Sequence, residues 1–147
     1  MTLDDLDRAV IRRLQVDGRL PYADIAAELD RPEHEIEECA ERLLADGVIE
    51  ILAVTDPIQL GYARQAMLGI EVDGPSQPVG LLLAEFDDVI YIARTDGKFQ
   101  LLVEVVGASD ARLLELVAQI RRIPGVRRIH TFLCTEVVKE TYAFGTA

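Results

Sequence analysis

The sequence predicts an α+β protein made of an N-terminal winged helix-turn-helix domain and a ferredoxin-like βαββαβ domain. Apolar residues recur at helical spacing in three short segments near the N-terminus, and an extended run follows them. The rest of the chain alternates in the order strand, helix, strand, strand, helix, strand, which is typical of the split βαβ arrangement. We therefore expect a first domain at residues 1–50, a hinge strand and linker at 51–62, and a second domain at 63–147.

Three helices are expected in the first domain. The first extends from Asp4 to Val16, the second begins at Pro21, and the third lies within Arg31–Ile49. Pro32 fits the first turn of the third helix, where the N–H that it lacks has no partner. Gly47 fits the left-handed position that ends a helix. On the third helix we expect buried side chains at Ile36, Ala40, Leu43 and Leu44, and an extended run then covers Ile51–Thr55.

Four strands and two helices are expected in the second domain. Asp96–Gly97 is typical of a tight hairpin, and Ser109 or Asp110 is suited to cap the second helix. That helix is expected to bury Leu113, Leu114, Val117 and Ile120. The strands are expected at 66–72, Val89–Thr95, Phe99–Val106 and Val126–Val138, and the first helix at Pro78–Phe86.

One face of the predicted sheet would be left without a covering helix. The residues expected there are apolar: Met67, Ile90, Ile92, Leu102 and Val106. An apolar sheet face that its own chain cannot cover suggests a partner subunit. We also expect Tyr142 and Phe144, in the C-terminal tail, to dock on a neighbouring surface.

The charge is unevenly distributed. The 147 residues carry 26 acids against 15 lysines and arginines, a net charge of −11. Residues 1–50 hold 14 acids and 6 arginines, a net of −8, whereas residues 51–147 have a net of only −3. Domains that bind nucleic acid usually carry the opposite sign, because phosphate neutralisation supplies most of their affinity. The acidity therefore counts against strong non-specific DNA binding by the first domain.

Several classes of protein are excluded by composition. We find no signal peptide and no apolar run that could span a bilayer, so we expect a soluble, cytoplasmic protein without a membrane partner. Cys39 and Cys134 are expected to be buried and reduced. His34 and His130 do not combine with them at metal-ligand spacing, so neither a metal nor another cofactor is expected. No serine, cysteine or histidine constellation suggests an enzyme.

Five stretches, in this order and with matching spacing, resemble the Lrp/AsnC family of transcriptional regulators. They are LDDLDRAVIRRLQVDGR at 3–19, RLLADGVIE at 42–50, AVTDPIQLGYARQAMLGIEV at 53–72, TDGKFQLLVEV at 95–105 and IRRIPGVRRIHTF at 120–132. The resemblance implies a DNA reader, an effector-binding domain, and homodimers that assemble into octamers or other higher oligomers. It also implies a small effector, usually an amino acid, near the hairpin loop.

The resemblance assigns two sets of residues in this chain. The DNA-binding set on the third helix is Arg31, Glu33, His34, Glu37, Glu38 and Arg42, and the effector-binding set is Thr95, Asp96, Gly97, Lys98, Phe99 and Gln100. Both sets depart from the family pattern. Ser, Thr and Arg are usual where this third helix has carboxylates, and Asp is common where this hairpin has Gln100.

Two functions remain open at this point. The first is a metabolite-responsive regulator that binds double-stranded DNA, in which glutamates read cytosine N4 groups. The second is an oligomerisation and effector-sensing module that acts through protein partners and does not bind DNA.

Overall fold

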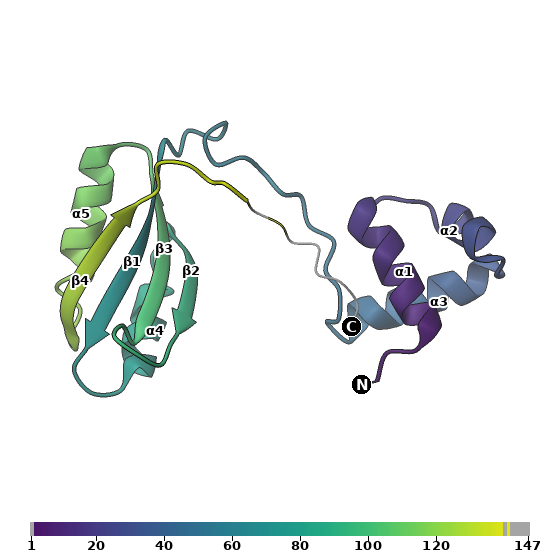
Figure 1. The fold of residues 1–147 in the computed structure, drawn as a ribbon, viewed down its shortest axis with the longest axis horizontal. Coiled ribbons are helices and arrows are strands. Elements are labelled where there is room, and N and C mark those ends of the chain that lie inside the picture. The colour runs from purple at the N-terminus through teal and green to yellow at the C-terminus, as the bar shows by residue number, and fades with distance from the viewer. Residues whose placement is uncertain (1, 140, 142–147) are drawn as a thin grey trace. The chain divides into compact units, whose positions relative to one another are not determined.

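The structure, a computed structural model, describes residues 2–139 and residue 141. It contains two compact units, one built on residues 1–54 and the other on residues 55–138 (Figure 1). Tyr142 and Phe144, the aromatic residues of the C-terminal tail, lie outside the described residues.

The first unit consists of three helices around one small core. They are α1 (Asp5–Val16), α2 (Tyr22–Leu29) and α3 (Glu33–Ala45). Asp4 caps α1 in a capping box, since its side chain accepts from the backbone N–H of Asp7 and the Asp7 side chain accepts from that of Asp4. Each helix contributes one apolar stripe, which is why the fully buried side chains include Val10, Ile25, Ile36 and Leu43.

Two expectations for the first unit are wrong. Leu44 is exposed, because it lies one position past the stripe that ends at Leu43. The run Ile51–Thr55 forms no strand within the described chain, since no described segment pairs with it. Its side chains are exposed, with Leu52 at 73%. The expected helix end is confirmed, because Gly47 has a φ of +66°.

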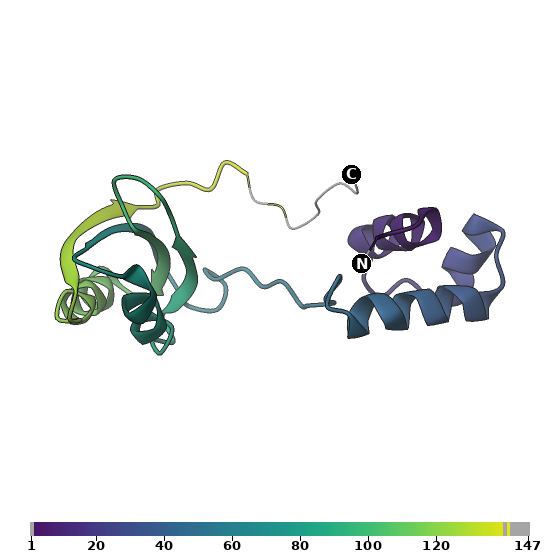
Figure 2. The ribbon, with the colours of Figure 1, turned by 90° about the horizontal axis from the view of Figure 1, so that it is seen from below.

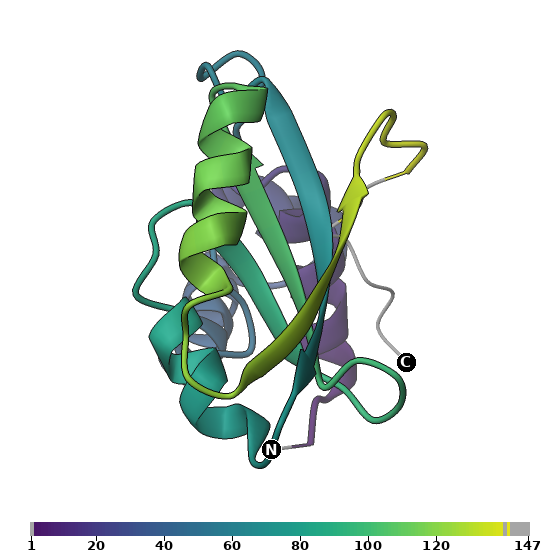
Figure 3. The same ribbon diagram turned by 90° about the vertical axis from the view of Figure 1, so that its left-hand side faces the viewer.

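The second unit is a four-stranded antiparallel sheet with two helices on one face (Figures 2 and 3). The strand order β2-β3-β1-β4 is that of the predicted ferredoxin-like fold. The elements are β1 (Arg64–Val72), α4 (Ser76–Leu83), β2 (Val89–Arg94), β3 (Leu101–Gly107), α5 (Asp110–Ile120) and β4 (Val126–Leu133).

The core of the second unit lies between the sheet and the two helices. In β1, Ala66, Leu68 and Ile70 face the helices, as the alternation predicted. Ile92 also packs on this core, which corrects its expected place on the outer face. The reason is a register shift between Val89 and Tyr91 that pairs Ile92 with inward-facing Val103.

Three further details differ from the expectation. Leu114 is 70% exposed, whereas Leu116 is fully buried, because the buried stripe of α5 passes through Leu113, Leu116, Val117 and Ile120. The last strand ends at Leu133, so Cys134 is exposed and not buried. Cys39 is buried, as expected, and both cysteines are free thiols. Across residues 2–139 and 141, no helix combines the length and apolar character needed to cross a bilayer.

The two leucines of α5 provide a test of this packing. We expect Leu116→Ala to lower the free energy of unfolding by about 2–5 kcal/mol, because it leaves a cavity in the core. Leu114→Ala should change it by less than about 0.5 kcal/mol, because that side chain is exposed. Denaturant unfolding of both variants measures the difference, and equal losses would contradict the position of α5.

Candidate functional site

An ion pair between a buried carboxylate and a half-exposed guanidinium joins α3 to α1. The side chain of Asp7 is 2% exposed, and its Oδ1 lies 2.5 Å from Nη2 of Arg42. The Cys39 thiol donates to the same oxygen at 3.2 Å. One carboxylate on α1 thus receives two groups from α3, one turn apart, and this fixes how α3 lies across the first unit.

These contacts change the acidity of both groups. Burial opposes ionisation of Asp7, but hydrogen bonds from the Asp4 backbone, Arg42 and Cys39 outweigh it and lower the pKa of the carboxyl. Burial, together with the hydrogen bond to Asp7, raises the pKa of the Cys39 thiol to about 12. Cys39 therefore stays a protonated donor and is not a reactive thiolate.

The exposed face of α3 is acidic. Glu33, His34, Glu37 and Glu38 are all exposed, so the structure places these four predicted DNA-binding residues on one accessible helix. The two predicted arginines are engaged with acids. Arg31 pairs with Glu35 at 3.5 Å, and Arg42 is the cation that pairs with Asp7.

The predicted effector residues form the loop between β2 and β3. The backbone N–H of Thr95 donates to the carbonyl of Gln100 at 3.1 Å, and the Thr95 hydroxyl donates to that of Phe99 at 2.7 Å. Asp96, Gly97 and Lys98 are exposed at the tip. The expected tight hairpin at Asp96–Gly97 is therefore wrong, since four residues separate the closing pair and β3 begins only at Leu101.

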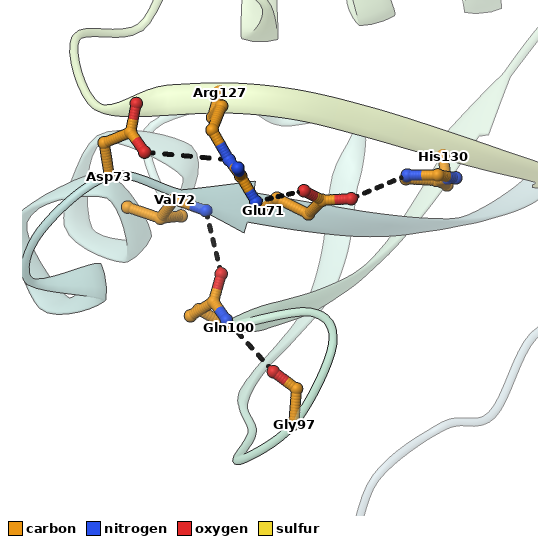
Figure 4. Close-up of polar contacts among 7 residues, drawn as sticks. All are labelled: Glu71, Val72, Asp73, Gly97, Gln100, Arg127 and His130. Atoms are coloured by element: carbon orange, nitrogen blue, oxygen red, sulfur yellow. Dashed lines mark hydrogen bonds and ion pairs between the residues drawn. The ribbon is translucent and has the colours of Figure 1, made fainter.

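Gln100 connects this loop to the end of β1. Its Oε1 accepts from the backbone N–H of Val72 at 2.9 Å, and its Nε2 donates to the carbonyl of Gly97 at 3.1 Å (Figure 4). Aspartate, common here in the resembling family, could accept from Val72 but could not donate to Gly97. Glutamine at position 100, where the family commonly has aspartate, thus links the loop to β1 through two hydrogen bonds.

Phe99 lies flat against the backbone of β1 on the outer face of the sheet. A Cβ built on Gly69 would come within 2.7 Å of the Phe99 ring, so only glycine allows this approach. The rings of His130 and Phe132 flank it, with centroids 5.1 and 6.3 Å away. Lys98 Nζ lies 5.2 Å from the Phe99 centroid.

Sequence reasoning missed Glu71, whose carboxylate is nearly buried beside this aromatic group. Glu71 forms an ion pair with Arg127 and lies 2.9 Å from Nε2 of His130. Arg127 also reaches Asp73 at 3.6 Å (Figure 4). The hydrogen bond from His130 and the positive charges of Arg127 and Arg128 outweigh desolvation and lower the pKa of Glu71. The sequence did contain a sign of this site, because Glu71 is a charged residue within the otherwise mostly apolar second half of β1.

Comparison with known proteins identifies the arrangement. Residues 3–44 match the AsnC-type helix-turn-helix domain, and residues 65–144 match the Lrp/AsnC ligand binding domain. The chain belongs to the Lrp/AsnC family. Lrp/AsnC proteins are helix-turn-helix transcriptional regulators with a ligand-binding domain, and this one is a regulator and not an enzyme.

Individual Lrp/AsnC relatives agree over nearly the whole chain. The HTH-type transcriptional regulator FL11 of Pyrococcus horikoshii is 30% identical over 95% of this chain and 93% of its own, and FL11 of Pyrococcus furiosus is 31% identical over 95% and 93%. The structure of Escherichia coli AsnC superposes with a TM-score of 0.89 at 23% identity, covering 97% of this chain and 99% of its own.

The ion pair in the Lrp/AsnC helix-turn-helix unit gives stability a pH dependence. Because folding lowers the pKa of Asp7 from its ordinary value of 3.8, the stabilisation is complete above that value and is lost as the pH falls through the lowered pKa. We expect Asp7→Asn to lower the Tm of this unit at neutral pH by about 5 °C or more and to flatten its fall below pH 4.

Circular dichroism melts between pH 7 and pH 3 measure this effect. Asp5→Asn is the matched control, because Asp5 is exposed in the same turn of α1. Identical pH profiles for the two variants would show that Asp7 does not carry the dependence.

The approach of Phe99 to Gly69 gives a second prediction. Gly69→Ala should lower the free energy of unfolding by about 1–3 kcal/mol, because the new methyl group displaces the ring. In a Phe99→Ala background the same change should cost little, since the ring is absent. A double-mutant cycle by denaturant unfolding measures this coupling, and additive effects would contradict the contact.

Proposed function

We propose that this protein is a DNA-binding regulator that reads duplex DNA with the exposed face of α3 and responds to a small effector at the β2–β3 loop. The carrying observation is that Asp7 and Arg42 fix α3 with Glu33, His34, Glu37 and Glu38 outward. Glutamates can accept hydrogen bonds from cytosine N4, so the acidic face has a means of reading bases.

The proposed reading mode has an unusual salt dependence. Four of the six arginines in residues 1–50 are in ion pairs with acids of the same unit: Arg13, Arg19, Arg31 and Arg42. Few cations are then left to neutralise phosphates, and the affinity of this unit for DNA should fall only weakly as salt rises.

For the effector, we infer an amino acid or a close analogue. A structure of the regulator NMB0573 from Neisseria meningitidis in complex with L-Met superposes with a TM-score of 0.87 at 16% identity, covering 97% of this chain and 96% of its own. Gln100 is neutral and already bonded to Val72 and Gly97, so it offers no charge to an α-ammonium group.

We also infer a homo-oligomer built on the uncovered sheet face. Tyr91 on β2 and Phe132 on β4 are half exposed, the strand register aligns both with Met67 of β1, and Phe132 lies against the Phe99 ring. A second copy would remove this apolar surface from water. Dimers joined in this way could assemble further into an octamer.

A second function is favoured by the same arginines. If acids of the same unit neutralise these arginines, the protein could act through protein partners, as an effector-sensing module that does not bind DNA. Pull-down of fragmented genomic DNA by the purified protein, at low and near-physiological salt and with or without amino acids, separates the two. We expect enrichment of a few discrete loci at both salt concentrations. If a folded oligomer enriches no DNA, the result supports the effector-sensing module instead.

The acidic face of α3 gives a prediction by charge reversal. Glu37→Arg with Glu38→Arg should raise the affinity for mixed-sequence duplex DNA by about tenfold or more at low salt, because it adds two phosphate contacts and removes two repulsions. Glu85→Arg with Asp87→Arg changes the net charge equally in the other unit and is the control. Fluorescence anisotropy measures both, and an equal gain in the control would show that the position of the charge does not matter.

A further inference from the structure

The positive charge of this chain is most concentrated at the turn between α5 and β4. Four of its 15 lysines and arginines lie within eight residues there: Arg121, Arg122, Arg127 and Arg128. The turn is tight, because the backbone N–H of Val126 donates to the carbonyl of Ile123 at 3.1 Å. Arg122 and Arg127 directly flank it, so the four cations lie at the ends of the two elements that meet at this turn.

Three of these four cations form no direct ion pair among the described residues, although the charge of Arg128 helps to lower the pKa of Glu71. Arg127 pairs with Glu71 and Asp73. Arg121, Arg122 and Arg128 are exposed, and none has an ion pair within residues 2–139 and 141. A position at the C-terminal end of α5 gives Arg121 and Arg122 a favourable helix dipole, but that does not account for Arg128 on β4.

The first unit shows the opposite arrangement. Most of its arginines are paired with acids, and the exposed side chains of α3 are carboxylates. Phosphate neutralisation nevertheless supplies a large share of the affinity of most DNA-binding proteins. If this chain binds DNA, the exposed arginines of the second unit are additional cations that can supply it.

We propose that Arg121, Arg122 and Arg128, here called the arginine turn, contact the phosphate backbone of duplex DNA. This inference rests on the proposed DNA-binding function and adds a second contact surface to it. The guanidinium group is suited to this role, because its planar donors match phosphate oxygens in pairs. The turn would supply affinity without regard to sequence, while α3 supplies the readout.

The arrangement fits a polymeric anion better than a small one. A site for a single phosphate or carboxylate brings its donors together in a concave, largely apolar pocket. The arginine turn instead presents separate, exposed cations on both sides of a turn. Phosphates that recur along a duplex can occupy several such positions at once.

The test measures the binding of the full-length protein to a mixed-sequence duplex by fluorescence anisotropy from about 50 to 300 mM KCl. We compare the wild type with Arg121→Gln/Arg122→Gln/Arg128→Gln. Each lost phosphate contact flattens the slope of log K against log salt by about 0.9, so the slope should become shallower by about 2–3 and the affinity at 50 mM KCl should fall more than tenfold.

Two control variants show whether charge at this place is the cause. Arg121→Lys/Arg122→Lys/Arg128→Lys keeps the cations and should retain the wild-type slope. Arg94→Gln removes one exposed cation from β2, at the opposite edge of the sheet, and should leave the slope unchanged. Thermal unfolding of each variant confirms that it is folded.

Several outcomes would overturn the inference. If the folded glutamine variant has the wild-type slope of log K against log salt, the arginine turn does not contact phosphates. That result would not affect the proposed DNA binding by α3. A glutamine variant that keeps its DNA affinity but loses self-association in sedimentation assigns the arginines to a contact between copies. A wild type that binds no mixed-sequence duplex at 50 mM KCl rejects the contact between the arginine turn and phosphates, whereas loss of the proposed DNA-binding function itself also requires that no locus is enriched in the genomic pull-down.

Discussion

The helix-turn-helix unit depends on the ion pair between Asp7 and Arg42. It is the contact in which a buried carboxylate on α1 receives both a guanidinium and a thiol from α3. The same carboxylate closes the capping box with Asp4. A charge removed from water is tolerated only where its hydrogen bonds are satisfied, so the start of α1 and the position of α3 are determined together. The outward face of α3, whatever it binds, is set by this inward contact.

This use of arginine explains the contrast between the two units. In the first unit, arginines neutralise acids of the same fold, and the exposed face is left with carboxylates. In the second unit, Arg64, Arg112 and Arg127 also pair with acids. Arg121, Arg122 and Arg128, however, are exposed and form no direct ion pair among the described residues. The net charges of residues 1–50 and 51–147 hide this difference, because they do not distinguish paired from unpaired groups. Binding to a polyanion depends on the unpaired ones.

Much of the fold follows from patterns in the sequence, and the errors have physical causes. Helical spacing and strand alternation predict every helix and every strand of the sheet, and Gly47 ends α3 as expected. The prediction for Leu114 was wrong because a small error in the position of a helix's apolar stripe moves a side chain from the buried face to the exposed face. The prediction for Ile92 was wrong because a register shift in the strand turns a side chain to the other face of the sheet. Ile51–Thr55 has strand-like composition, but a strand also needs a partner, and pattern alone does not supply one.

The candidate site was less accessible to sequence reasoning. The exposure of Glu37 and Glu38 follows from helical phase. The pairing of Arg42 with Asp7, 35 positions apart, does not, and neither does the contact of Phe99 with Gly69. Such contacts depend on how helices and strands pack. When a residue type has two common roles, its presence in the sequence does not show which role it has. Arginine on a reading helix suggests DNA, and here it also holds the fold.

The most direct test of this account is a carbon-detected NMR titration of the Asp7 carboxyl in the wild type and in Arg42→Met. We expect a wild-type pKa below the ordinary 3.8 and a clear rise when the guanidinium is removed. A wild-type pKa at or above that value, or one that does not respond to Arg42→Met, would show that Arg42 does not hold α3 in place.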